Sequence, residues 1–339
     1  MSRFGLIRPA LWPVMLLALL ASLAPAAPVR AQMDLSPLLS AELGRLKTSL
    51  SYQAETSGEQ KVTSPSQPAD LGYTQQDLRA FGPLWQGPGQ ELSLAGRARL
   101  LALDTTARFP SGQVMPSELW DLGLSALYRR RLSNGWIVGG QLGSGSASDK
   151  PFQGEKEMLL SATAFARIPN GERDAWLVFL NYDHKRDYSD YAPVIPGAAY
   201  WWTPSRQFQA LIGLPLLSLR WRPAPDWDFS VSYAIPRTLR SRASYRLWGP
   251  LKVYGGYEMT SQSFFLSGRM HEEDRLYFYQ RRALGGLEVS LGRGLALDLF
   301  GGWSFDRMFF EGQNYGDRGQ QRVDVDDGAF LGGRLGYRF

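Results

Sequence analysis

From about residue 89 onward, apolar and polar side chains alternate with a period of two, which is the pattern of a strand whose two faces meet different media. Between residues 227 and 235, aromatic and aliphatic side chains take the odd positions, while Asp228 and two serines take even ones. The apolar faces often begin or end in Trp or Tyr, as the two aromatic girdles of a membrane barrel require. The pattern predicts an all-β fold, an antiparallel transmembrane β-barrel.

The connections between these segments alternate between short and long. Hairpin signals lie at Ser133-Asn134-Gly135 and Pro169-Asn170-Gly171, with further tight turns near residues 203–205, 223–226, 248–250 and 292–294. Longer polar segments cover residues 104–117, 144–154, 184–193, 260–274 and 306–327. Membrane barrels place short turns on the periplasmic side and long loops outside. Counting back from Phe339 puts every tight turn on one side, and we expect about 14 strands, within a range of 12 to 16.

The remaining segments of the mature chain are harder to assign. Residues 44–54 alternate and predict a first strand, residues 56–69 predict a polar loop, and residues 71–81 fit either. A reversal at residues 213–216 is the least firm of the predicted turns. The longest apolar run, residues 211–219, contains a proline and is shorter than the ~18 residues that a spanning helix needs. Any passage through a membrane must therefore use strands.

Residues 1–31 have the three parts of a secretory signal peptide. Arg3 and Arg8 precede an apolar run from Leu11 to Ala24, and Val29-Arg30-Ala31 offers a cleavage site before Gln32. Cleavage removes Arg3, Arg8 and Arg30 and no acid, so the net charge falls from +5 to about +2. The high pI therefore gives no support for nucleic-acid binding. We expect residues 32–339 to form one outer-membrane domain, with the first strands and a polar loop in 44–88 and the main run of strands in 89–339.

The last segment, residues 329–339, alternates apolar with small or cationic positions and finishes on Tyr337, Arg338 and Phe339. It resembles the final strand of bacterial outer-membrane barrels. That resemblance implies the outer membrane of a diderm bacterium, contact with lipid and lipopolysaccharide, and recognition of Tyr337 and Phe339 by the barrel-assembly machinery. Residues 193–200, 213–215 and 221–223 resemble the central strands of an uncharacterised outer-membrane barrel family. This resemblance rests on the positions of Pro and Gly residues, so it implies a location and a fold but no activity.

Candidate catalytic chemistry is sparse. The chain has no cysteine and two histidines, His184 and His271, both in predicted external loops. Asp183 and Ser189 near His184 make a lipid- or lipopolysaccharide-hydrolase an alternative, although neighbours on a loop rarely have triad geometry. Acidic clusters at residues 272–274 and 324–327 raise the alternative of Ca²⁺ binding by oxygen ligands. We expect no enzyme, no cofactor and no dedicated metal site.

Strand parity instead predicts an arginine-rich lumen. If the barrel is open, this set favours a porin-like channel for anions, because guanidinium groups bind carboxylate and phosphate. If it is plugged, arginine and acid ladders merely rigidify a structural or surface-interaction barrel. Neither a solute nor an oligomeric state follows from the sequence. The predicted lumen-lining residues are Arg97, Arg99, Arg129, Arg220, Arg222, Asp228, Arg240, Arg242, Arg246, Arg334 and Arg338, with Arg131 and Arg167 also inward and Asp121, Glu258, Glu288, Asp298 and Asp306 as the inward acids.

Overall fold

The computed structural model describes residues 41–63, 68–184, 194–234, 238–269, 271–319 and 322–339. The predicted signal peptide lies outside these residues. Nearly all of the described chain is strand. The strands are β1 (Ser49–Thr63), β2 (Ala69–Gln86), β3 (Gln90–Thr105), β4 (Glu118–Arg131), β5 (Ile137–Ser148), β6 (Met158–Asn170), β7 (Asp174–Asp183), β8 (Val194–Trp202), β9 (Phe208–Leu214), β10 (Leu216–Trp221), β11 (Trp227–Ala234), β12 (Thr238–Trp248), β13 (Leu251–Phe264), β14 (Arg275–Gly292), β15 (Leu295–Gly312), β16 (Arg322–Val325) and β17 (Gly328–Arg338). Two short 3-10 turns, η2 (Glu155–Glu157) and η3 (Tyr315–Asp317), interrupt the connections.

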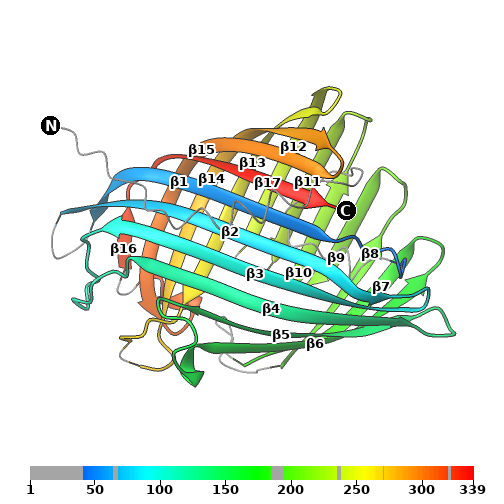
Figure 1. Ribbon diagram of the computed structural model, residues 1–339, viewed down its shortest axis with the longest axis horizontal. Coiled ribbons are helices and arrows are strands. Elements are labelled where there is room, and N and C mark those ends of the chain that lie inside the picture. The colour runs from blue at the N-terminus through cyan, green and yellow to red at the C-terminus, as the bar shows by residue number, and fades with distance from the viewer. Residues whose placement is uncertain (1–40, 64–67, 185–193, 235–237, 270, 320–321) are drawn as a thin grey trace.

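The strands form one closed antiparallel ring, in which β1 to β15 pair with their sequence neighbours and β1 closes the ring on β16 and β17 (Figure 1). β16 and β17 occupy the same place in the wall, because both pair with β15 on one side and β1 on the other. Counting them as one interrupted strand gives a sixteen-stranded barrel, at the upper end of the predicted range. Closure leaves no free sheet edge, which is what a membrane-spanning sheet requires. Among the described residues, no helix is long and apolar enough to cross a membrane.

The tight turns lie at one end of the ring, as predicted. Each tight turn joins the two strands of one hairpin, and β17 also ends on this side of the ring. The turns are residues 87–89, 132–136, 171–173, 203–207, 222–226, 249–250 and 293–294. Gly294 shows why glycine is needed at such a turn. Its φ is +86°, and a Cβ there would stand 2.0 Å from the backbone oxygen of Arg338.

Two N-terminal predictions need correction. Residues 56–63 are strand and not loop, because β17 and β2 both supply ladder partners for β1 beyond Thr56. The ambiguous residues 71–81 belong to the 18-residue strand β2. Polar side chains at the outer ends of these strands are no obstacle, because those ends extend beyond the lipid-facing belt. The predicted reversal at residues 213–216 is correct, since β9 and β10 pair directly on either side of Pro215.

Strand length divides the wall into two regions. We name β1–β5 with β13–β15 the tall sector, where strands have 12 to 18 residues. We name β8–β11 the low sector, where strands have 6 to 9 residues. Figure 1 shows β1 to β6 as long ribbons in the near wall.

The outer surface of the ring carries an exposed apolar belt. Leu124, Leu142, Leu299 and Leu331 all point out of the wall with more than half of their surface exposed. Aromatic side chains flank this belt, including a continuous row on the turn side made by Trp202, Phe208, Trp221, Phe229, Trp227 and Tyr245. Exposed aliphatics bordered by Trp and Tyr are the signature of a surface bathed in lipid. The protein is an outer-membrane β-barrel, as the sequence predicts.

Candidate functional site: the arginine-rich interior

Contacts between strands that are not neighbours identify the face that looks into the barrel. Arg99 on β3 donates from Nη1 to Gln262 Oε1 on β13 over 3.2 Å, and Gln262 Nε2 donates to Gln75 Oε1 on β2 over 2.8 Å. The Tyr73 hydroxyl on β2 donates to Gln280 Oε1 on β14 over 3.3 Å. These bonds join opposite walls of the tall sector, so they cross the interior. The face that carries Arg99 is therefore the inner face of the barrel.

Arg97 and Arg99 belong to a compact charge network on that face. Arg99 Nη2 lies 2.8 Å from Asp77 Oδ2, and Arg97 Nη2 lies 2.8 Å from Asp121 Oδ1. Arg79 adds a second partner for Asp77 at 2.7 Å. Asp77 and Arg79 were absent from the sequence prediction because their strand was ambiguous. Two carboxylates facing three guanidinium groups leave this part of the inner wall cationic but strongly cross-linked.

Arg129 has a different environment from the other predicted lumen residues. Its side chain is fully buried, forms an ion pair with the buried Glu91 and also donates to the backbone oxygen of Glu42. The second Glu91 oxygen accepts from the backbone N–H of Gly44 over 2.8 Å. The segment before β1 therefore covers this pair at the turn end of the barrel. Arg129 anchors the chain there and does not border open space.

The low sector and β12 hold the densest group of inward arginines. Arg220 on β10 and Arg222, which follows the strand directly, share Asp228 on β11, at 2.7 Å and 2.9 Å. Arg222 keeps 46% of its side chain exposed. Arg246 on β12 stands opposite Lys252 on β13, so two cations face each other across the ladder.

The other two arginines of β12 are paired more fully than the sequence predicts. Arg242 lies 3.0 Å from Glu288 and 3.8 Å from Asp298, while Arg240 lies 3.9 Å from Glu258. The guanidinium of Arg242 also stacks on Tyr254, 3.3 Å from the ring centroid. The sequence predicts Glu258, Glu288 and Asp298 as inward acids, but it does not show that β13, β14 and β15 place them beside β12.

Two further predicted residues, Arg334 and Arg338, lie on the last strand, β17. Arg334 contacts Asp298 at 3.7 Å and donates to Gln53 Oε1. Arg338 pairs in register with Ser49, and the Tyr337 and Phe339 rings lie 5.0 Å apart at the turn end. Asp306 is not inward, because a register shift on β15 gives it a φ of +50° and turns it toward Arg281, 3.1 Å away on the outer face.

Arg282 is the main inner charge that sequence reasoning missed. It pairs with Glu55 on β1 at 2.7 Å and with Glu258 on β13, and its guanidinium lies 5.0 Å from the Phe330 ring centroid. A signal for it existed, since Arg282 shares strand parity with the predicted inward Glu288. Glu55 carried no such signal, because the pairing of β1 with β17 was not fixed by the sequence.

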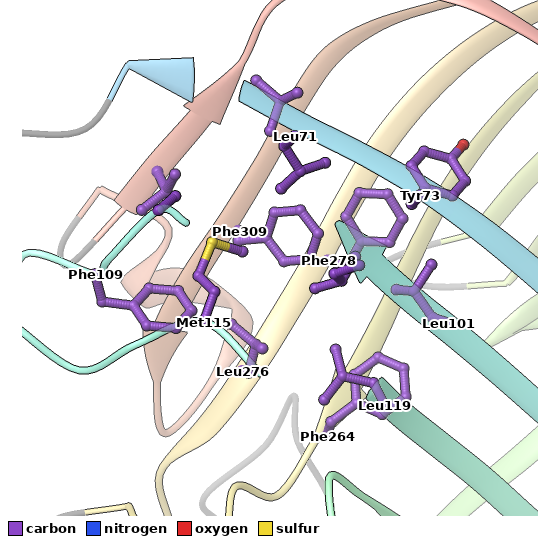
Figure 2. Close-up of a cluster of buried hydrophobic side chains, with 14 of the residues drawn as sticks. Leu71, Tyr73, Leu101, Phe109, Met115, Leu119, Phe264, Leu276, Phe278 and Phe309 are labelled. Carbon is purple, nitrogen blue, oxygen red and sulfur yellow. The ribbon is translucent and has the colours of Figure 1, made fainter. Parts of the chain in front are cut away.

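The outer end of the tall sector contains an apolar core inside the barrel. Leu101 and Leu119 from one wall meet Phe278 and Phe309 from the opposite wall, and Phe109 from the β3–β4 connection packs beside them (Figure 2). The Phe278 and Phe309 rings stack 4.5 Å apart. Asp149 ties the neighbouring connections together by accepting from both the backbone and the hydroxyl of Ser267 over 2.7 Å. Among the described residues, this core fills the space between the two walls at the outer end of the tall sector.

The two histidines lie apart. His271 Nδ1 is 3.0 Å from Asp274 Oδ2 with the ring largely exposed, and the backbone N–H of His184 donates to Leu160. Ser189 lies outside the described residues, so the His184 triad has no geometry to judge. In the acidic clusters, Asp324 pairs with Arg322 and Glu272 with Lys156. Within the described ranges, no group of three or more His, Asp or Glu side chains is placed to hold a metal ion.

Comparison with known proteins finds similarity only at the level of the barrel. No protein-family model matches the chain and no curated protein matches it, so the resemblance to an uncharacterised barrel family gains no support. Among solved structures, OccK7 of Pseudomonas aeruginosa aligns with a TM-score of 0.37 at 11% identity, over 87% of this chain and 99% of that one. An outer membrane channel from Pseudomonas putida F1 gives 0.35 at 12% identity, over 86% and 95%. The translocator domain of the autotransporter NalP from Neisseria meningitidis gives 0.30 at 12%, over 90% and 92%. With TM-scores this low, none of these proteins informs the role of this chain.

Proposed function

We propose that this barrel is a non-enzymatic outer-membrane channel that favours anions. The observation that carries the proposal is the cationic group on the inner face of β10–β13, formed by Arg220, Arg222, Arg246 and Lys252 around Asp228 and Glu288. These four cations lie beside two acids, one of which, Glu288, also pairs with Arg242. Arg222 keeps nearly half of its side chain exposed, so its field reaches water in the lumen. Guanidinium groups stay charged at every working pH and hold carboxylate or phosphate oxygens in a bidentate manner.

The passage in this proposal follows the low sector. The apolar core occupies the outer end of the tall sector, whereas inward serines such as Ser218, Ser230 and Ser232 alternate with the arginines of β10–β12. A lumen that is apolar on one side and polar on the other guides a hydrated ion along the polar side. The low sector is also the shorter part of the wall, which shortens the path.

Single-channel recording in a salt gradient tests the proposal. We expect a reversal potential of the sign that anion preference gives, and a shift toward cations in the double variant Arg222→Glu with Arg246→Glu. The preference weakens as salt rises, because charges separated by ~8 Å are screened at physiological ionic strength. Arg206→Glu is the control for one such charge reversal, since it replaces a cation with an acid in the exposed turn between β8 and β9. A cation-selective wild type sinks the proposal.

A closed structural barrel is the second candidate, and the apolar core favours it. Cross-barrel contacts of Leu101 and Phe278 with their neighbours rigidify the outer end in a way that a passive pore does not need. This candidate predicts no conductance from correctly folded protein that migrates as a compact, heat-modifiable band. A folded protein without channels in repeated bilayer trials therefore replaces the first proposal with the second.

A lipid or lipopolysaccharide hydrolase is the third candidate. It rests on the contact of His271 with Asp274, which resembles the general base and its orienting carboxylate in a catalytic triad. Replacing both His184 and His271 with Ala removes every imidazole in the chain. Lipase or deacylase activity that disappears in this variant would establish an enzyme.

A further inference from the structure

The wall of the barrel is lowest at one hairpin, β9 and β10. These strands have 7 and 6 residues, and the single residue Pro215 joins them. A tilted strand needs about 9–11 residues to cross the hydrocarbon layer of a membrane. The hairpin therefore falls short of the span that its tall-sector counterparts exceed.

The spacing of the outward aromatic side chains on a tall-sector strand shows how far this hairpin falls short of the membrane span. On β4, the outward aromatics Trp120 and Tyr128 are eight residues apart and mark the two girdles. On β10, only five residues separate Trp221, which belongs to the turn-side girdle, from Leu216 at the tip. Three missing residues correspond to roughly 10 Å of strand, or about 7 Å of depth at a 45° tilt. The tip of the hairpin therefore lies below the outer girdle, at the level of the lipid chains.

The chemistry of the tip agrees with that depth. Residues 211–217 contain no polar side chain, in contrast to the polar connections that top the tall sector. Leu214 leaves 68% of its surface exposed, and Ile212 and Leu217 are also exposed outward. Exposed leucines at a loop tip are costly in water and favourable in hydrocarbon.

The inner face beside this low point is amphipathic. Phe179, Trp201 and Leu216 pack on a buried apolar cluster that contains Leu177 and Leu211. On β10, the inward positions then pass from Leu216 through Ser218 to Arg220, and Arg222 follows the strand directly. An apolar surface thus stands four residues, or roughly 13 Å, from a pair of guanidinium groups.

We propose that the β9–β10 hairpin forms a lateral opening between the lumen and the outer-leaflet lipid, and that it passes long-chain carboxylates. The carboxylate binds Arg222 and Arg220 in competition with Asp228, and the chain lies along Leu216 and Trp201 toward the low rim. This inference rests on the proposed channel and names its substrate class. It also explains how a lumen whose tall side is filled with apolar side chains communicates with the outside.

The position of the tip is tested with a spin label, which the absence of native cysteine makes site-specific. Full-length Leu214→Cys in a bilayer carries the nitroxide, with Leu142→Cys as the lipid-belt reference and Phe152→Cys as the reference in the exposed connection after β5. We expect the Leu214→Cys label to be relaxed by oxygen and shielded from a water-soluble nickel complex, like Leu142→Cys. Relaxation by nickel, as for Phe152→Cys, overturns the lateral opening.

The ligand class is tested by tryptophan quenching with brominated dodecanoate in nanodiscs. We expect saturable quenching that Trp201→Phe reduces, and a half-saturating concentration raised roughly tenfold in Arg222→Gln, since a hydrogen bond to a charged group is worth about one such factor. Brominated dodecanol, which has the same chain and no charge, should not distinguish Arg222→Gln from wild type. Equal half-saturation of both proteins by dodecanoate, or no saturable quenching, overturns the proposal. The chloride reversal potential is read separately, so failure of the opening and failure of the channel are distinguishable.

Discussion

The tall and low sectors of this barrel share one sequence rhythm and differ in what fills their inner faces. Both alternate outward aliphatics with inward side chains of another kind. In the tall sector the inward positions turn apolar near the outer end and meet across the lumen, with Leu101 opposite Phe278 and Phe309. On β10 and β11 of the low sector the inward positions near the turn end are serines, Arg220 and Asp228, and β9 and β10 stop early. On β8 and β9 the inward positions include Trp201 and Leu211, which pack in a second apolar cluster. The short wall therefore combines a polar strip on β10 and β11 with an apolar strip on β8 and β9, whereas the long wall is filled by apolar side chains at its outer end.

The largest expected effect comes from the charge at the centre of the tall sector. Arg282→Ala leaves Glu55 and Glu258 without their shared cation in the interior. Removing one partner of a buried pair costs about 3–5 kcal/mol. The temperature at which the fast, folded band disappears from a gel should fall strongly. Arg97→Ala is the comparison, because Arg97 is half-exposed and its loss should cost about 1 kcal/mol or less.

Core truncation should be nearly as costly in the tall sector. Leu101 is fully buried between the two walls, and Leu101→Ala should destabilise the barrel by about 2–5 kcal/mol through lost burial and a residual cavity. Leu217→Ala on the lipid-facing side of the low sector should cost less, because that side chain packs against lipid and not against a fixed neighbour. Thermal melting in detergent measures both. Equal losses would show that the core does not set the stability of the tall sector.

The same core should also control conductance. If it closes the outer end of the tall sector, Phe278→Ala with Phe309→Ala should raise single-channel conductance without changing ion preference. The reason is that the removed rings carry no charge and lie far along the wall from Arg222. A changed reversal potential in this variant would place the ion path through the tall sector.

Charge reversal at Arg222 and Arg246, next to the low sector, should shift ion selectivity with a small effect on stability. Arg222→Glu and Arg246→Glu are better probes than changes at Arg240 and Arg242. Removing the latter two would leave Glu258, Glu288 and Asp298 short of partners. A change in ion selectivity could then not be separated from a loss of stability. Reversal potentials at low and high salt, with melting temperature as the control, separate the two effects.

The smallest expected effect is at the histidines. His271 has an exposed ring and one local contact, so His271→Ala should leave melting and conductance within error of wild type. The variant serves as a baseline for the others. A large loss of either property would give His271 a role that neither sector explains.

The sequence by itself determined the fold class and the side of the tight turns, and its strand parity predicted which side chains face inward. Side-chain parity and turn chemistry are local properties, and Asn134-Gly135 or Gly292 to Gly294 signal a hairpin without knowledge of any distant strand. It also indicated the reversal at Pro215. Local signals failed where a strand is polar, as at residues 56–63, and where a bulge shifts parity, as at Asp306.

Only the tertiary structure decided which charges meet and where the interior is filled. Closure brings β1 against β17 and places Glu55 beside Arg282, although 227 residues separate them. Closure likewise sets Gln75 against Gln262 and Leu101 against Phe278. Whether an inward arginine is paired depends on strands across the ring, and strand length relative to the membrane depends on where each girdle falls. These are properties of the assembled wall, and no single strand encodes them.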